Sequence, residues 1–162
     1  MTRMTTATAT VMTTVTSTTD PLVELKATIK GARHLASLIF PVEPVPASRP
    51  RVTRWGTYIA KPYKDWINAA TASVESCGSV VNGSPADTLL VITTAICTRA
   101  KTSKLTLPRG DSDNYGKAAL DLVTKLGGYW HDDKQVAPAI CSKRFAAKGE
   151  RARTEVHIYL LP

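Results

Sequence analysis

The chain has 162 residues, which is enough for one domain with a buried core but short for two. Hydrophobic residues make up 43% and charged residues 21%, so the composition is globular and excludes disorder over the whole length. The formal net charge of +8, from 21 basic and 13 acidic side chains, favours a polyanionic partner, with nucleic acid as the leading one.

Residues 1–33 are predicted to form a flexible, Thr-rich extension in front of the domain. Residues 1–19 consist mostly of Thr, Ala, Val and Met, with neither a helical apolar stripe nor turn residues. A short helix over residues 21–31 could follow this tail, because Pro21 suits a first helical position.

The domain itself is predicted over residues 34–162 and begins with an apolar strand over residues 34–40. A proline-rich loop follows and holds an extended path, because proline fixes φ and has no backbone donor. Residues 48–61 then alternate basic with apolar or aromatic side chains around Gly56, which predicts a small cationic hairpin.

Two helices and three further strands complete the predicted domain. Apolar positions at helical spacing predict helices over residues 62–77 and 114–126, and the second is ended by Gly127-Gly128. Runs of apolar and β-branched residues predict strands over residues 88–98, 135–146 and 153–160. The expected fold is an α/β (α+β) domain with a small mixed β-sheet and two main helices.

Cysteines and apolar runs bound the environment of the chain. The three cysteines are odd in number, far apart and without C-x-x-C spacing, which favours a reducing interior over a zinc or redox motif. No apolar run approaches the roughly 18 to 20 residues that a membrane span needs. We therefore expect a soluble protein that does not use a membrane as its partner.

Asp111 and Asp113 are the first residues that indicate chemistry. In an extended segment they project to the same side, and two crowded carboxylates repel each other unless a cation or a proton intervenes. A hard divalent cation such as Mg²⁺ suits them, and it suits phosphodiester hydrolysis because it activates water and offsets phosphate charge. The structural alternative stays open, because Asp and Asn before a helix are ordinary turn and cap residues.

Lys117 and the pair Asp132-Asp133 add to this cluster. Lys117 lies one helical turn beyond Asp113 and could neutralise a phosphate, or it could pair with Asp113 or Asp121 on a solvated helix face. Asp132-Asp133 could supply a third metal ligand or form a surface turn. The joint occurrence of these residues in a basic chain favours a metal-dependent nuclease site.

These motifs resemble the RusA-like Holliday junction resolvases. The resemblance rests on DSDNYGKAALD at residues 111–121 and WHDDKQV at residues 130–136, which share the pattern D-x-D-N-x-x-K-x-x-x-D…D-D-x-Q-V. Residues 44–51, PVPASRPR, are similar to a proline- and arginine-rich segment of many members, as are Tyr58 and Lys61, and Lys143 matches a recurrent family lysine. The resemblance covers about residue 34 to the C-terminus.

The resemblance implies a RusA-like fold and a homodimeric, Mg²⁺-dependent endonuclease that resolves four-way DNA junctions by paired nicks, with Mn²⁺ as a second usable ion. The protein would be located in the cytoplasm of a bacterial or phage-infected cell. By motif position, Asp111, Asp113 and Asp133 are the implied metal ligands and catalytic acids, and Lys117 is the implied catalytic lysine. Asp132 is an additional candidate, although adjacent aspartates normally point apart and the family pattern favours the second.

The basic side chains divide into candidate DNA contacts and surface charges. The candidates lie in the hairpin, in the loop before the aspartates and in the strand after them: Arg49, Arg51, Arg54, Lys101, Lys104, Lys143 and Arg144. Trp55 and Tyr58 could stack at a DNA branch point, but packing within the protein is the favoured interpretation of both. Two alternatives stay open: a nuclease of the same fold that acts on other branched DNA, and a non-catalytic, basic DNA-binding module.

Overall fold

The computed structural model describes residues 21–48, 51–54, 56–78 and 84–162, so the tail expected over residues 1–19 lies outside the described residues. The elements in chain order are α1 (Pro21–Gly31), β1 (Arg33–Phe40), β2 (Arg51–Thr53), β3 (Gly56–Tyr58), α2 (Lys61–Ala72), β4 (Glu75–Gly78), β5 (Leu89–Cys97), α3 (Ser112–Leu126), the 3₁₀ turn η1 (Asp133–Gln135), β6 (Val136–Phe145) and β7 (Arg153–Leu160). No helix within these ranges is long and apolar enough to cross a membrane.

The centre of the fold is a five-stranded mixed sheet in the order β4-β1-β7-β5-β6. β5 and β6 run parallel, and α3 lies between them in the chain, whereas the other neighbouring strands run antiparallel. A parallel pair needs such a crossover connection, so the segment between β5 and β6 supplies both α3 and the loop in front of it. The prediction of a small α+β domain with a mixed sheet is therefore confirmed.

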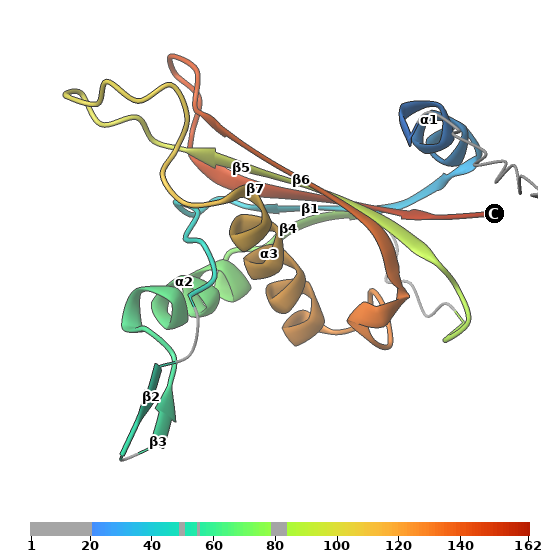
Figure 1. Ribbon diagram of the computed structural model, residues 1–162, viewed down its shortest axis with the longest axis horizontal. Coiled ribbons are helices and arrows are strands. Elements are labelled where there is room, and N and C mark those ends of the chain that lie inside the picture. Colours follow the sequence, from blue (N-terminus) through green and yellow to red (C-terminus); the bar gives the residue numbers. More distant parts are fainter. Residues whose placement is uncertain (1–20, 49–50, 55, 79–83) are drawn as a thin grey trace, which may run out of the picture.

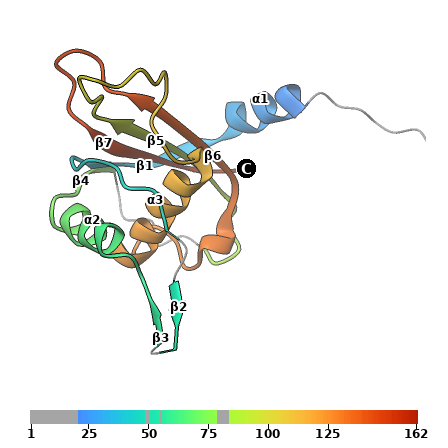
Figure 2. The same cartoon turned by 60° about the vertical axis from the view of Figure 1, so that its left-hand side comes forward.

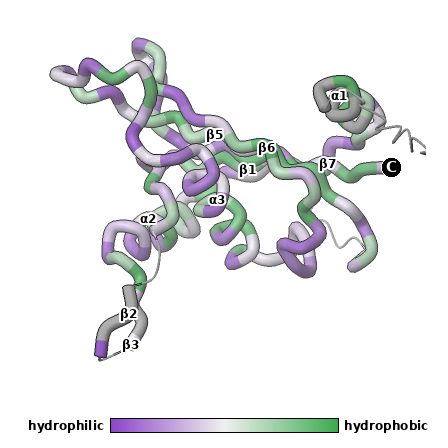
Figure 3. Tube along the Cα trace, in the orientation of Figure 1, coloured by the Kyte–Doolittle hydropathy of each residue, from purple (hydrophilic) through white to green (hydrophobic). Residues whose placement is uncertain are grey.

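One face of the sheet is covered by α2 and α3 (Figures 1 and 2). Alternate residues of β1 and β7 are buried, as expected when a single face of a strand enters the core. On that face, α2 adds Tyr63 and Trp66, and α3 adds Leu122 and Val123, to the same buried cluster. Figure 3 shows where hydrophilic residues gather instead: in the loop between β5 and α3 and around η1.

The hairpin predicted over residues 48–61 is confirmed as the antiparallel pair β2 and β3. It projects away from the sheet and the helices in both views (Figures 1 and 2). Tyr58, the last residue of β3, is 48% exposed, so the expectation that this ring packs within the protein is wrong. Trp55, for which packing was also expected, lies outside the described residues.

The helix predicted over residues 62–77 is too long. α2 ends at Ala72, and Glu75–Gly78 forms β4, which the sequence did not predict. β4 pairs antiparallel with β1 and forms one edge of the five-stranded sheet. An edge strand satisfies backbone groups by pairing, and this long-range gain outweighs the weak local preference for about one further helical turn.

Candidate metal and nucleic-acid site

Asp111 and Asp113 lie at the N-terminus of α3, and both are exposed. Asp111 occupies the N-cap position, but its side chain makes no capping hydrogen bond. Its Oδ2 accepts a long hydrogen bond of 3.5 Å from Nδ2 of Asn114. Within the described part of the chain, no lysine or arginine forms an ion pair with either aspartate. The carboxylates are thus free to bind a cation.

Two hydrogen bonds hold the backbone directly in front of these aspartates. The ammonium group of Lys143, on β6, donates to the carbonyl oxygen of Gly110. The hydroxyl of Tyr115, in the first turn of α3, donates to the carbonyl oxygen of Arg109 at 2.8 Å. Lys143, predicted as a DNA contact, therefore fixes the residue that precedes Asp111.

The first turn of α3 is also fixed by close packing against β6. A Cβ atom on Gly116 would overlap Sγ of Cys141 and would lie 2.9 Å from its Cβ, so only glycine fits at this crossing. On another side, the backbone N–H of Ala47 donates to the carbonyl oxygen of Asn114 at 2.9 Å. The helix end that carries the aspartates is therefore rigidly positioned on the sheet.

Lys117 lies one turn beyond Asp113 and is exposed. No ion pair joins Lys117 to Asp113 or Asp121, all three of which the structure describes, so the surface-pair interpretation of this lysine finds no support. Asp121 instead accepts a hydrogen bond of 2.9 Å from the hydroxyl of Tyr63 and joins α3 to α2. Burial, and then this carboxylate, raise the pKa of Tyr63.

Asp132 stabilises the 3₁₀ turn η1 that follows it. Its carboxylate caps η1 by accepting the backbone N–H of Lys134 at 2.9 Å, and this hydrogen bond is the main cause that lowers the pKa of Asp132. Gln135 completes the capping box and donates from Nε2 to the carbonyl oxygens of Ser84 and Asp87, at 3.0 and 3.1 Å.

Asp133 follows in η1, beyond the C-terminal end of α3. It is exposed, and its carboxylate makes no ion pair with any described lysine or arginine. α3 has 15 residues, which at the helical rise makes it about 22 Å long. Figure 1 shows η1 and the start of α3 at opposite ends of the helix.

The three predicted metal ligands are therefore not assembled within one chain. Asp111 and Asp113 lie together, whereas Asp133 lies apart. Among the residues that the structure describes, no three His, Cys, Asp or Glu side chains are arranged to hold a metal ion. The oxygen donors still suit a hard cation, which binds through a few carboxylates.

Apart from Lys143, whose hydrogen bond to Gly110 is described above, the candidate DNA contacts fall into three groups. Arg54, Lys101 and Lys104 are exposed in the hairpin turn and in the loop before α3, and Arg51 lies on β2. Arg144 is engaged in a bidentate ion pair, with both guanidinium nitrogens 2.6 Å from the carboxylate oxygens of Glu150. Arg49 lies outside the described residues.

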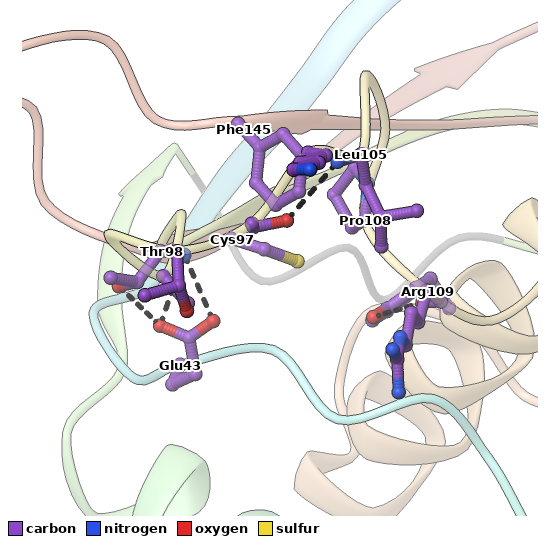
Figure 4. A pocket seen from close by; sticks show the side chains of 12 residues that line it. Glu43, Cys97, Thr98, Leu105, Pro108, Arg109 and Phe145 are labelled. Atoms are coloured by element: carbon purple, nitrogen blue, oxygen red, sulfur yellow. Dashed lines mark hydrogen bonds between the residues drawn. The ribbon is translucent and has the colours of Figure 1, made fainter.

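A pocket beside the aspartates was not predicted from the sequence (Figure 4). It lies under the loop between β5 and α3, and Glu43 lines it from the proline-rich loop after β1. Both carboxylate oxygens of Glu43 accept hydrogen bonds from Thr98: one accepts from the backbone N–H at 2.9 Å, the other from the hydroxyl at 2.6 Å. A single acidic residue among prolines gives no pattern from which this contact could be read.

The fold and the site define a small, basic α+β protein with exposed carboxylates at a helix end, beside a cationic loop. Residues 41–159 match the family described as Endodeoxyribonuclease RusA, and this match includes every described candidate residue above. The chain therefore belongs to the RusA endodeoxyribonuclease family, as the sequence motifs implied. No curated protein sequence matches the chain.

Proposed function

We propose that this protein is a Mg²⁺-dependent endodeoxyribonuclease that resolves four-way DNA junctions by paired nicks, with Mn²⁺ as an alternative ion. The observation that carries the proposal is the pair of exposed carboxylates of Asp111 and Asp113, which lack a cationic partner among the described residues of a chain in the RusA family. The nuclease domain would span residues 34–162, behind an extension over residues 1–33, and would act in the cytoplasm of a bacterial or phage-infected cell.

Asp111 and Asp113, with Asp133, would hold the divalent ion. When bound, such an ion stabilises negative charge on the phosphate and activates water for its attack. Lys117 projects from the same helix one turn on, where its ammonium group can offset charge that develops on the phosphate. The hydrogen bond from Lys143 to Gly110 keeps the aspartates in a fixed position, which limits reorganisation during the reaction.

A homodimer would complete this site. Asp133 lies at the far end of α3 from Asp111 and Asp113, so a single chain leaves the predicted ligands apart. In a two-fold symmetric dimer, Asp133 of one subunit can meet Asp111 and Asp113 of the other, and symmetry then produces two equal sites. Two related sites suit two nicks in symmetric strands.

DNA would be held by the projecting hairpin and by the loop before α3. Arg51 and Arg54 lie in the hairpin, and Lys101 and Lys104 are exposed in the loop. Arg49 precedes the hairpin and remains a proposed contact, as does Arg144 beside its carboxylate partner. Phosphate contacts of this kind position a duplex without reading its bases, which gives structure-selective binding.

The test is cleavage of a synthetic four-way junction by the purified protein with and without Mg²⁺. We expect paired nicks with the wild type and a loss of cleavage with Asp113→Asn, while junction affinity is retained. Asp65→Asn is the matched control, because Asp65 is an exposed helical aspartate whose only ion pair within the described residues is with Lys61. Linear duplex, forks and flaps of the same sequences are the competing substrates.

Each alternative gives a distinct result. Faster cleavage of forks or flaps than of four-way junctions would replace junction resolution by activity on other branched DNA. Tight binding without cleavage in Mg²⁺ or Mn²⁺ would favour a non-catalytic DNA-binding module. Equal cleavage by the wild type and Asp113→Asn would show that the assigned carboxylates are not the site.

A further inference from the structure

The pocket between β5, α3 and the loop that joins them has a volume of about 640 Å³, within the usual range for small-ligand sites (Figure 4). Its floor includes Cys97 and Tyr115, both of which are buried. Burial raises the pKa of the Cys97 thiol, so this part of the floor is uncharged at neutral pH. Phe145, Leu105 and Pro108 add apolar walls.

The loop over this pocket is fixed by Arg99. Its guanidinium carbon lies 5.3 Å from the centroid of the Phe145 ring, and its Nη2 donates to the carbonyl oxygen of Leu105 at 2.8 Å. The same side chain thus lies against the Phe145 ring and holds the loop backbone. The pocket is formed in advance of any ligand, which lowers the entropic cost of binding.

Charged groups lie on two sides of the pocket. Figure 4 shows Glu43 and Thr98 on one side and Arg109 on the other. The carboxylate of Glu43 disfavours a phosphate inside the pocket, whereas Lys104 and Arg109 are exposed and attract phosphates to its rim. The walls therefore suit a flat, neutral group with polar edges that is attached to a phosphate chain.

The pocket adjoins the proposed metal site. Arg109 precedes Asp111 by two residues, and Tyr115 follows Asp113 by two residues on the first turn of α3. A DNA strand whose phosphate lies at these aspartates would have its neighbouring nucleotides at the mouth of the pocket. Nucleotides at a branch are already partly unstacked, so moving one base out of the stack costs less there than in a continuous duplex.

We propose that this pocket receives one nucleobase, turned out of the DNA stack next to the phosphate held at the N-terminus of α3. The base would pack against Phe145 and Leu105, and its polar edge would face Glu43 and Thr98. This inference rests on the proposed action on branched DNA. It assigns to Leu105 and Phe145 a part in choosing the position of the nick.

The test is a four-way junction that carries 2-aminopurine at each nucleotide near the branch in turn, because this base becomes fluorescent when it leaves the stack. Binding is measured without divalent ions, so the result does not depend on cleavage. We expect a several-fold rise in fluorescence at one position with the wild type. Leu105→Trp, which fills the pocket, should abolish that rise and should spread cleavage in Mg²⁺ over more positions.

Leu107→Trp is the matched control, because Leu107 is an exposed leucine of the same loop that does not line the pocket. It should behave as the wild type, and Phe145→Leu should show a weaker rise if Leu105→Trp fails to fold. An equal response of the Leu105→Trp and Leu107→Trp proteins, or no response at any position in a bound junction, would overturn the pocket assignment. A fluorescent response without cleavage in Mg²⁺ would overturn the proposed nuclease function alone, and absence of junction binding would overturn both.

Discussion

Gly116 lies where α3 crosses β6, and the side chain of Cys141 fills the space beside it. Alanine is the better helix former by about 0.5–1 kcal/mol, yet the added methyl group would overlap the sulfur atom. We expect Gly116→Ala to lower the free energy of unfolding by about 1–3 kcal/mol, as overpacked cores do. Urea denaturation measures the change.

Cys141→Ala provides the internal check, because it removes the sulfur atom that a methyl group on Gly116 would overlap. The Gly116→Ala/Cys141→Ala protein should be more stable than the sum of the two single changes predicts. Strict additivity would show that the two side chains are not in conflict.

Lys143 links β6 to the residue before Asp111, so its loss should act on metal binding more than on DNA affinity. We expect Lys143→Met to raise the Mg²⁺ concentration for half-maximal cleavage by about 10- to 100-fold, the usual effect of removing support from a metal ligand. Lys143→Arg should restore part of the loss. Cleavage is measured over a Mg²⁺ titration, and junction affinity by fluorescence anisotropy.

Lys148→Met is the control for charge, because Lys148 is an exposed lysine in the turn between β6 and β7. A fall in junction affinity with an unchanged Mg²⁺ requirement would instead make Lys143 the DNA contact that the sequence predicted.

At the scale of elements, α2 and α3 are joined by the hydrogen bond from Tyr63 to Asp121. Tyr63→Phe should lower the free energy of unfolding at pH 7 by about 1–2 kcal/mol, because the substitution removes a partly buried hydrogen bond to a charged carboxylate. The pKa of Tyr63 is raised in the folded protein, so its contribution is complete below the unfolded value of about 10 and falls as the pH rises above it.

The difference between wild type and Tyr63→Phe should therefore narrow above about pH 10. Tyr115, whose pKa is also raised, is present in both proteins and cancels in the comparison. Urea denaturation at pH 7 and at alkaline pH measures both differences, and a gap that widens with pH would contradict the assignment.

Most elements follow from local pattern. The helix at Pro21–Gly31 and the strand at Arg153–Leu160 have the predicted bounds, and the predictions for β1, β5, β6 and α3 agree within two residues. β4 was not predicted, because its four residues form a strand only by pairing with the edge of β1. A local sequence pattern indicates buried positions and turns, but it does not indicate whether a strand remote in sequence has an edge open for pairing.

At the scale of the whole molecule, the distance between the two acidic segments predicts a site shared by two subunits. Homodimers of Asp113→Asn and of Asp133→Asn should both be inactive. A mixed dimer of the two would place both changes in one site and leave the other intact. We expect mixing, with subunit exchange, to restore nicking of one strand per junction while paired cleavage stays low.

The nicked and the resolved products are separated by gel electrophoresis after mixing. Mixing with Asp111→Asn in place of Asp133→Asn is the control, because Asp111 and Asp113 lie on the same helix end and cannot complement each other. No recovery in either mixture would mean that each subunit carries a complete site.

The sequence by itself determined the class of fold, most element bounds, the basic character and the motif that the RusA family match confirms. These properties can be predicted because burial and turns require particular side-chain types at particular spacings along the chain, and charge follows directly from composition. Only the tertiary structure decided that Asp133 lies away from Asp111, that Lys143 holds Gly110, and that Glu43 and Phe145 meet around one pocket. Distances between residues remote in sequence are set by strand pairing and helix packing, which no local pattern specifies.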